Sequence, residues 1–145
     1  MFLEFLPGLD VTNDVLAGSA LGVLIGALLV VGIIVALAIY IYHALAWQTI
    51  ARKQKYKHPW LAWIPFANFA MILSLGGFHW AWIFLLIIPV IGWLAVFILM
   101  IIAIWRIFEK RKYPGWFSLA PIIPKVGGIL YLISIGFVAW KDKKK

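Results

Sequence analysis

The sequence predicts an all-α integral membrane protein, a bundle of about four transmembrane helices with proline-broken segments. Of its 145 residues, 66% are hydrophobic and only 12% are charged, whereas soluble domains carry about 25% charged residues. Long uncharged stretches alternate with basic clusters, and most of the nine tryptophans stand near the ends of these stretches. This is the pattern of membrane spans flanked by basic loops and an aromatic belt.

The first span is expected at about residues 18–47. Residues 1–14 are interpreted as an interfacial N-terminal arm, with Thr12, Asn13 or Asp14 as the helix N-cap. Residues 15–51 carry no formal charge, so as a helix they exceed the ~30 Å hydrocarbon core of a bilayer. Acidic residues precede this stretch and basic residues follow it, so the positive-inside rule predicts an outside N-terminus and a cytoplasmic loop at 52–58.

A line of small residues marks one face of this first span. Gly18, Gly22 and Gly26 recur at a spacing of four, which lets another helix approach closely. We expect a helix-packing face here, used within the chain or between copies.

The next uncharged stretch, residues 58–105, predicts two spans at about 60–76 and 80–106. The turn at 76–79 would lie outside, opposite the basic residues 106–112. Proline breaks a helix because it lacks an N–H donor, so Pro65 and Pro89 are expected to interrupt these spans. Asn68 is expected to bond the carbonyl that Pro65 leaves without its helical partner.

The last stretch admits two interpretations. A fourth span at about 117–140, kinked by Pro121 and Pro124, places the basic tail 141–145 outside. An interfacial or re-entrant piece would instead keep this tail inside, as the positive-inside rule requires. The fourth span is the preferred interpretation.

Basic residues at the edges of the spans are candidates for contact with lipid headgroups or other anions, an interaction of roughly 1 kcal/mol each at an anionic leaflet. Nucleic acid is not an expected partner, because no soluble module carries the charge. The candidates are Arg52, Lys53, Lys55, Lys57, Lys110, Arg111, Lys112 and Lys125.

No constellation for chemistry is visible. The chain has no cysteine, and no Asp or Glu falls inside a predicted span. His43, His58 and His79 are far apart and on different predicted sides, which does not suit a metal site. We therefore expect no enzyme activity, no catalytic residue, no cofactor and no metal.

An internal repeat leads to a family resemblance. Aligning Trp60 with Trp116 places Pro65 on Pro121 and overlays two basic clusters. The runs W-L-A-W-I-P-F-A-N and G-G-F-H-W-A-W-I-F-L-L-I-I-P-V-I-G, followed by Y-P-G-W-F-S-L-A-P, resemble the DUF5684 family of small prokaryotic membrane proteins. The sequence departs from that pattern at Gly92, where the family has Asn. The resemblance implies a multi-span architecture and transfers no activity.

These features together favour a non-enzymatic accessory or structural membrane subunit that packs with partner helices and lipid, in a larger complex or a homo-oligomer. The expected location is a prokaryotic cytoplasmic membrane. The alternative is a small channel or carrier formed by the proline-broken helices.

Overall fold

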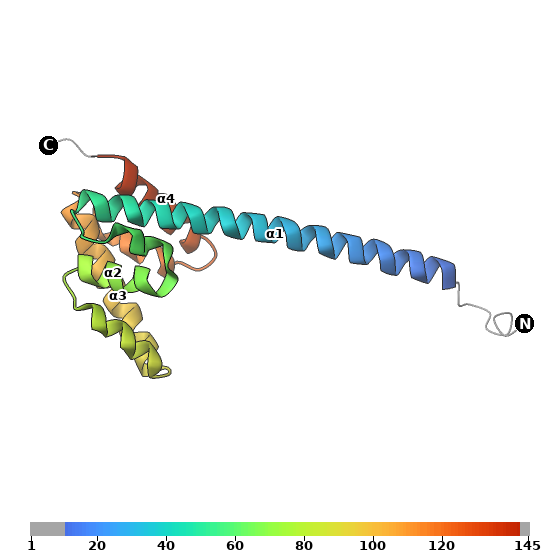
Figure 1. Cartoon of the computed structure of the whole chain (residues 1–145), viewed down its shortest axis with the longest axis horizontal. Coiled ribbons are helices and arrows are strands. Elements are labelled where there is room, and N and C mark those ends of the chain that lie inside the picture. The colour runs from blue at the N-terminus through green and yellow to red at the C-terminus, as the bar shows by residue number, and fades with distance from the viewer. Residues whose placement is uncertain (1–10, 143–145) are drawn as a thin grey trace, which may run out of the picture. The chain divides into compact units, whose positions relative to one another are not determined.

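The computed structural model describes residues 11–142, and the regular structure it shows there is helical. A long helix is followed by three pairs, each a 3-10 helix and then an α-helix (Figure 1). The elements are α1 (Val11–Lys53), η2 (Pro59–Trp63), α2 (Pro65–Leu75), η3 (Trp80–Ile87), α3 (Ile91–Lys110), η4 (Gly115–Ile122) and α4 (Gly127–Trp140).

Two of the described helices are long and apolar enough to cross a membrane. They cover Thr12–Lys53 and Ile91–Lys110. The helices α2 and α4 are shorter, with 11 and 14 residues. The all-α class is therefore confirmed, while the expected count of about four spans is not.

The described residues form two units, one up to Tyr40 and the other from Ile41 onwards. In the first unit, every side chain from Thr12 to Tyr40 is exposed. The expected N-cap at residues 12–14 is wrong, because α1 already includes these residues, and Asp14 lies in its first turn. A carboxylate there is favourable beside the positive end of the helix dipole. The rest of the expected arm, residues 1–10, lies outside the described residues.

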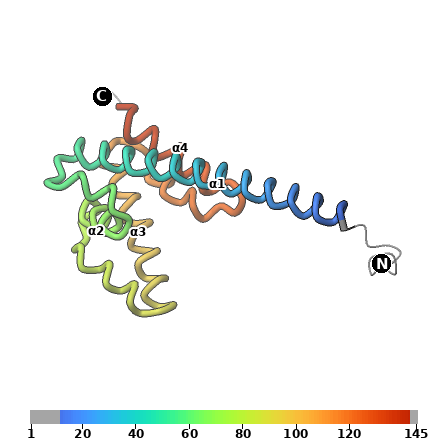
Figure 2. Tube along the Cα trace, turned by 45° about the vertical axis from the view of Figure 1, so that its right-hand side comes forward, coloured from blue at the N-terminus to red at the C-terminus, as the bar shows by residue number. Residues whose placement is uncertain are grey.

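In the second unit each 3-10 helix and the α-helix after it form a hairpin. The chain runs out along η2, η3 or η4 and returns along α2, α3 or α4 (Figure 2). The expected spans 60–76, 80–106 and 117–140 each contain one such reversal.

An isoleucine followed by proline makes each reversal. Ile64, Ile88 and Ile123 have extended backbones. Their N–H groups donate to the carbonyls of Leu61, Leu85 and Ala120 at 3.1, 2.9 and 3.1 Å. Each of these carbonyls stands four residues before the proline, so it is the group that proline deprives of a helical donor. The isoleucine N–H replaces that donor at all three breaks.

Asn68 therefore does not have the expected role. The carbonyl of Leu61, left free by Pro65, receives the N–H of Ile64 instead. The backbone N–H of Asn68 donates to the carbonyl of Ile64 at 2.7 Å, and the Oδ1 atom of its side chain is buried without a hydrogen-bond partner in the described part of the chain.

Two of the three hairpins close tightly enough to require glycine. A Cβ atom on Gly92 would lie 1.8 Å from the carbonyl oxygen of Leu85, and one on Gly127 would lie 2.4 Å from that of Ala120. Both glycines stand three residues after the proline of their hairpin, the position that Asn68 occupies in the first one. This contact explains why glycine stands at position 92, where the resemblance leads one to expect Asn.

The same two hairpins contain strained turns. Val90 and Lys125, which follow Pro89 and Pro124, have φ values of 62° and 70°. The N–H of the next residue donates to the carbonyl of the proline, at 2.7 Å for Ile91 and 2.9 Å for Val126. This bond and φ match the γ-turn, a rare and strained conformation.

These equivalences change the alignment of the internal repeat. The structural counterparts of Pro65 are Pro89 and Pro124, whereas Pro121 lies inside η4. Trp60 and Trp116 do correspond, as the second residues of η2 and η4. Because η4 has 8 residues and η2 only 5, aligning their beginnings misplaces the proline.

Three helices also end in the same way. Lys55, Gly77 and Lys112 have φ values of 56°, 85° and 61°. The aromatic residue that follows each, Tyr56, Phe78 or Tyr113, donates its N–H to the carbonyl five residues earlier, at 2.9, 2.8 and 2.9 Å. This is the Schellman motif of helix C-termini. Each of the three aromatic side chains packs with the hydrophobic core.

The core lies near the last turns of the four α-helices. Ile50 of α1, Leu73 of α2, Phe108 of α3 and Val138 of α4 are all fully buried and belong to one cluster. Each stands two or three residues before the end of its helix. The packing therefore brings four helix C-termini together.

Two neighbouring glycines test the close contact in the third hairpin. A Cβ on Gly127 would meet the backbone of Ala120 and Pro121, whereas one on Gly128 would meet nothing within 4 Å. We expect Gly127→Ala to destabilise the protein by about 1–3 kcal/mol, as overpacking does, and Gly128→Ala to be neutral or stabilising. Thermal unfolding in detergent measures both. Equal melting temperatures for the two variants would show that the contact does not matter.

Candidate functional site

The convergence of helix ends gathers most of the chain's charge on one surface, which we call the cationic face. Its described members include nine basic residues and two acidic ones. They are Arg52, Lys53, Lys55, Lys57, Arg106, Glu109, Lys110, Arg111, Lys112, Lys141 and Asp142.

Two basic residues of α3 bind the end of α2. Lys110 Nζ donates to the carbonyl of Leu75 at 2.6 Å, and Arg106 Nη1 donates to that of Gly76 at 3.2 Å. The Arg106 guanidinium also lies 4.7 Å from the centre of the Phe78 ring. The last carbonyls of a helix lack intrahelical donors and carry the negative end of its dipole, so cations suit them. The turn at 76–79 thus lies against the basic residues from which the sequence interpretation separated it by a membrane.

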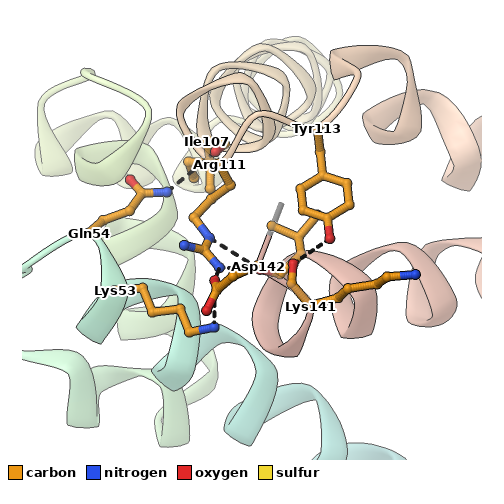
Figure 3. Close-up of polar contacts among 8 residues, drawn as sticks. Lys53, Gln54, Ile107, Arg111, Tyr113, Lys141 and Asp142 are labelled. Atoms are coloured by element: carbon orange, nitrogen blue, oxygen red, sulfur yellow. Dashed lines mark hydrogen bonds and ion pairs between the residues drawn. The ribbon is translucent and has the colours of Figure 1, made fainter. Parts of the chain in front are cut away.

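A second set of contacts binds the end of α4 to α3 and α1 (Figure 3). Arg111 donates through Nε and Nη2 to the carbonyl of Val138 at 3.2 and 3.1 Å, and through Nη2 to the carboxylate of Asp142. Lys53 Nζ lies 2.9 Å from the same carboxylate. The Tyr113 hydroxyl donates to the carbonyl of Lys141. One carboxylate and one arginine therefore hold three helix ends together.

These contacts change the acidity of Asp142. Hydrogen bonds from Lys53 and from Arg111 lower the pKa of this carboxyl below its ordinary value of 3.8, because they stabilise the ionised form. The group is solvent-exposed, so solvent screens the interaction and limits its effect on stability.

The structure divides the predicted headgroup residues into three groups. Lys53, Lys110 and Arg111 bind carbonyls or a carboxylate of the chain itself. Lys125 is exposed at the reversal between η4 and α4, at the opposite end of α4 from Val138. The remaining candidates, Arg52, Lys55, Lys57 and Lys112, are exposed residues of the cationic face.

A polar cluster that sequence reasoning did not identify joins α1 to α4. Trp47 Nε1 lies 3.0 Å from the Tyr131 hydroxyl, which lies 3.1 Å from His43 Nε2. The Tyr42 hydroxyl donates to the carbonyl of Leu132 at 2.8 Å. The spacing of four between His43 and Trp47 places both on one helix face, which was the available signal. No sequence signal identified the partner Tyr131, because it is distant along the chain.

The other predicted packing face lies in the first unit. Additional Cβ atoms on Gly18, Gly22 or Gly26 would meet no atom within 4 Å. Within the first unit, the described residues therefore leave room for another helix at this face.

No protein-family model matches the sequence, and neither the curated proteins nor the solved structures include a match. The resemblance to DUF5684 therefore stays an expectation from the sequence motifs.

Arg111 and its neighbour Lys112 provide a matched test of the helix-end contacts. Arg111→Gln removes the charge that binds Val138 and Asp142, whereas Lys112 is exposed. We expect the first variant to lose about 1–3 kcal/mol of stability, as when a buried or half-buried carbonyl loses a charged donor, and Lys112→Gln to stay within about 0.5 kcal/mol of the wild type. Chemical denaturation in detergent micelles can compare them. A larger loss in Lys112→Gln would contradict the assignment.

The pKa of Asp142 predicts how acid affects the same contacts. A carboxyl whose pKa is lower in the folded state stabilises that state above its unfolded pKa, and this contribution disappears as the pH falls through the folded pKa. Asp142→Asn should therefore lower the melting temperature slightly near neutral pH. The difference from the wild type should vanish well below pH 3.8. A difference that is constant across this range would rule out the ionised carboxylate as its source.

Proposed function

We propose that the protein is a non-enzymatic accessory or structural subunit of a membrane assembly, either a larger complex or a homo-oligomer. The observation that carries this proposal is the long apolar surface of α1. Side chains from Thr12 to Tyr40 are exposed on every side of the helix. A helix that is apolar all round belongs in lipid or against other apolar helices.

The glycines of α1 supply a docking face on this surface. In lipid the hydrophobic effect does not drive helices together, so association depends on close packing at small residues. Gly18, Gly22 and Gly26 form such a ridge, and the described residues of the first unit leave it open. A partner helix, from another protein or a second copy, fits this position.

The remaining parts anchor and orient the subunit. Basic residues concentrate on the cytoplasmic side of membrane proteins, which favours a cytoplasmic cationic face and an outside N-terminus in a prokaryotic cytoplasmic membrane. Arg52, Lys55, Lys57 and Lys112 are exposed on that face. They are positioned to contact the phosphates of lipid headgroups.

The channel or carrier alternative has less support. The carbonyls at the three Ile-Pro breaks are bound by amides of their own hairpins, so these breaks turn the chain. A groove of about 310 Å³ in the second unit is lined largely by apolar side chains, among them Phe69, Trp93 and Met100. Such a lining suits an acyl chain better than a hydrated solute.

A substitution on the glycine ridge tests the proposed association. Gly22→Leu fills the ridge, whereas Ala20→Leu adds a similar side chain on the opposite helix face. We expect Gly22→Leu to weaken association at least about tenfold, or ~1.4 kcal/mol, and Ala20→Leu to leave it unchanged. The measurement is the mass of the particle that carries the protein after gentle solubilisation from its membrane. An unchanged particle with Gly22→Leu, or a lone wild-type monomer, would overturn the proposal.

A further inference from the structure

The four α-helices end at the same face of the second unit. Lys110 and Arg106 of α3 bind the last residues of α2. Arg111 binds the last turn of α4, and Lys53 at the end of α1 meets Asp142 just after α4. The chain therefore leaves this face after α1, after α2 and after α3, and each time comes back to it.

The outward segments are too short to cross a bilayer. The helices η2, η3 and η4 contain 5, 8 and 8 residues, and a 3-10 helix rises about 2.0 Å per residue. They reach about 10–16 Å, roughly half of the ~30 Å hydrocarbon core or less. By itself, the helix α3 is long enough to span a membrane. The η3 segment, which leads to the beginning of α3, is too short to do so.

The reversals are suited to a place within the membrane. Irregular backbone is tolerated at that depth only where its polar groups are bound. The carbonyl exposed by each proline receives the isoleucine N–H. The isoleucines at the turns, Ile64, Ile88 and Ile123, are apolar and exposed. Lys125, at the third turn, is charged and exposed, and its long aliphatic stem allows the ammonium group to extend out of the apolar layer.

Tryptophans mark the opposite ends of the outward segments. Trp60, Trp80 and Trp116 stand at the first or second position of η2, η3 and η4, and 55%, 52% and 61% of their surfaces are exposed. Exposed indole rings prefer the headgroup level of a membrane. The cationic face and these rings together form a surface of the composition that binds the interface of an anionic leaflet.

From these observations we infer that residues 54–142 form a one-sided membrane module. Three re-entrant hairpins enter the bilayer from the cationic face and return to it, and the cationic face with Trp60, Trp80 and Trp116 binds the anionic headgroup layer of that single leaflet. This inference rests on the proposed insertion of α1 across the membrane. It assigns the turn at 76–79 and Asp142, the last described residue, to the same side as the 52–58 loop.

Single cysteines can test this arrangement, because the chain contains no cysteine of its own. Asp14→Cys and Lys57→Cys report the two ends of α1. His79→Cys reports the turn after α2, Lys141→Cys the end of α4, and Val126→Cys the reversal before α4. The full chain is assembled in membrane vesicles of known orientation and treated with a membrane-impermeant maleimide.

The one-sided module predicts that the thiols at 57, 79 and 141 react from one side and the thiol at 14 from the other. The thiol at 126 should be protected from both sides. Reaction at 79 from the side of residue 14 would identify an ordinary two-span hairpin, and reaction at 126 from that side would identify a crossing fourth helix. Either result overturns the inference. Reaction of 14 and 57 from the same side would instead overturn the proposed insertion of α1.

Headgroup binding is tested in the same vesicles with spin-labelled phosphatidylglycerol and phosphatidylcholine. We expect the anionic probe to be enriched at the protein several-fold, and this preference to fall towards equality in the variant Arg52→Gln, Lys55→Gln, Lys57→Gln, Lys112→Gln. The control Lys125→Gln should keep it, because this residue lies away from the cationic face. Equal association of both probes with the wild type would rule out an anionic headgroup surface.

Discussion

The arrangement of the helices in this protein depends on hydrogen-bond donors for the carbonyls at the ends of the apolar helices. Each helix leaves its last carbonyls without intrahelical partners, and an apolar chain has few side chains that can supply them. Here the donors are Arg106, Lys110 and Arg111, all near the end of α3. Because these three side chains bind the ends of α2 and α4, they determine that the helices finish together. Some residues of the cationic face therefore bind helix ends of the protein itself. Only the other exposed residues of this face are available to lipid.

The same requirement governs the opposite ends of the hairpins. Proline removes a donor from the carbonyl four residues earlier, and the N–H of the preceding isoleucine takes its place in all three hairpins. Such local closure brings the returning helix very near the outgoing one. Glycine at positions 92 and 127 relieves the resulting contact, and left-handed backbone at Val90 and Lys125 accommodates the turn. Three unlike sequences therefore adopt one geometry because they share an Ile-Pro pair and a small or polar residue three positions after the proline.

Hydropathy and charge predicted the all-α class and the long first helix. Proline marked the breaks at Pro65, Pro89 and Pro124, whereas the break expected at Pro121 is wrong, because this residue lies inside η4. These features follow from local composition, which sequence reasoning reads well. Local composition did not predict whether the chain continues in the same direction or turns back after each break. An uncharged stretch such as 58–105 is long enough for two spans and equally for two hairpins. Distant contacts, including Lys110 with Leu75 and Trp47 with Tyr131, decide between them. The sequence carried one usable signal, the threefold recurrence of Ile-Pro, but an alignment on tryptophans concealed it.

The shared position of the helix ends also bears on how the chain can be made. Moving a lysine or arginine through the centre of a membrane costs about 2.5–3.5 kcal/mol or more. The loop at 52–58 and the segment at 106–112 together hold eight basic residues, and in a one-sided module none of them needs to be transported. Each hairpin closes over neighbouring residues and can be inserted as it leaves the ribosome, from the side of synthesis. In such a module the part of this sequence that crosses the bilayer lies before residue 52, where there is no lysine or arginine and the only carboxylates are Glu4, Asp10 and Asp14.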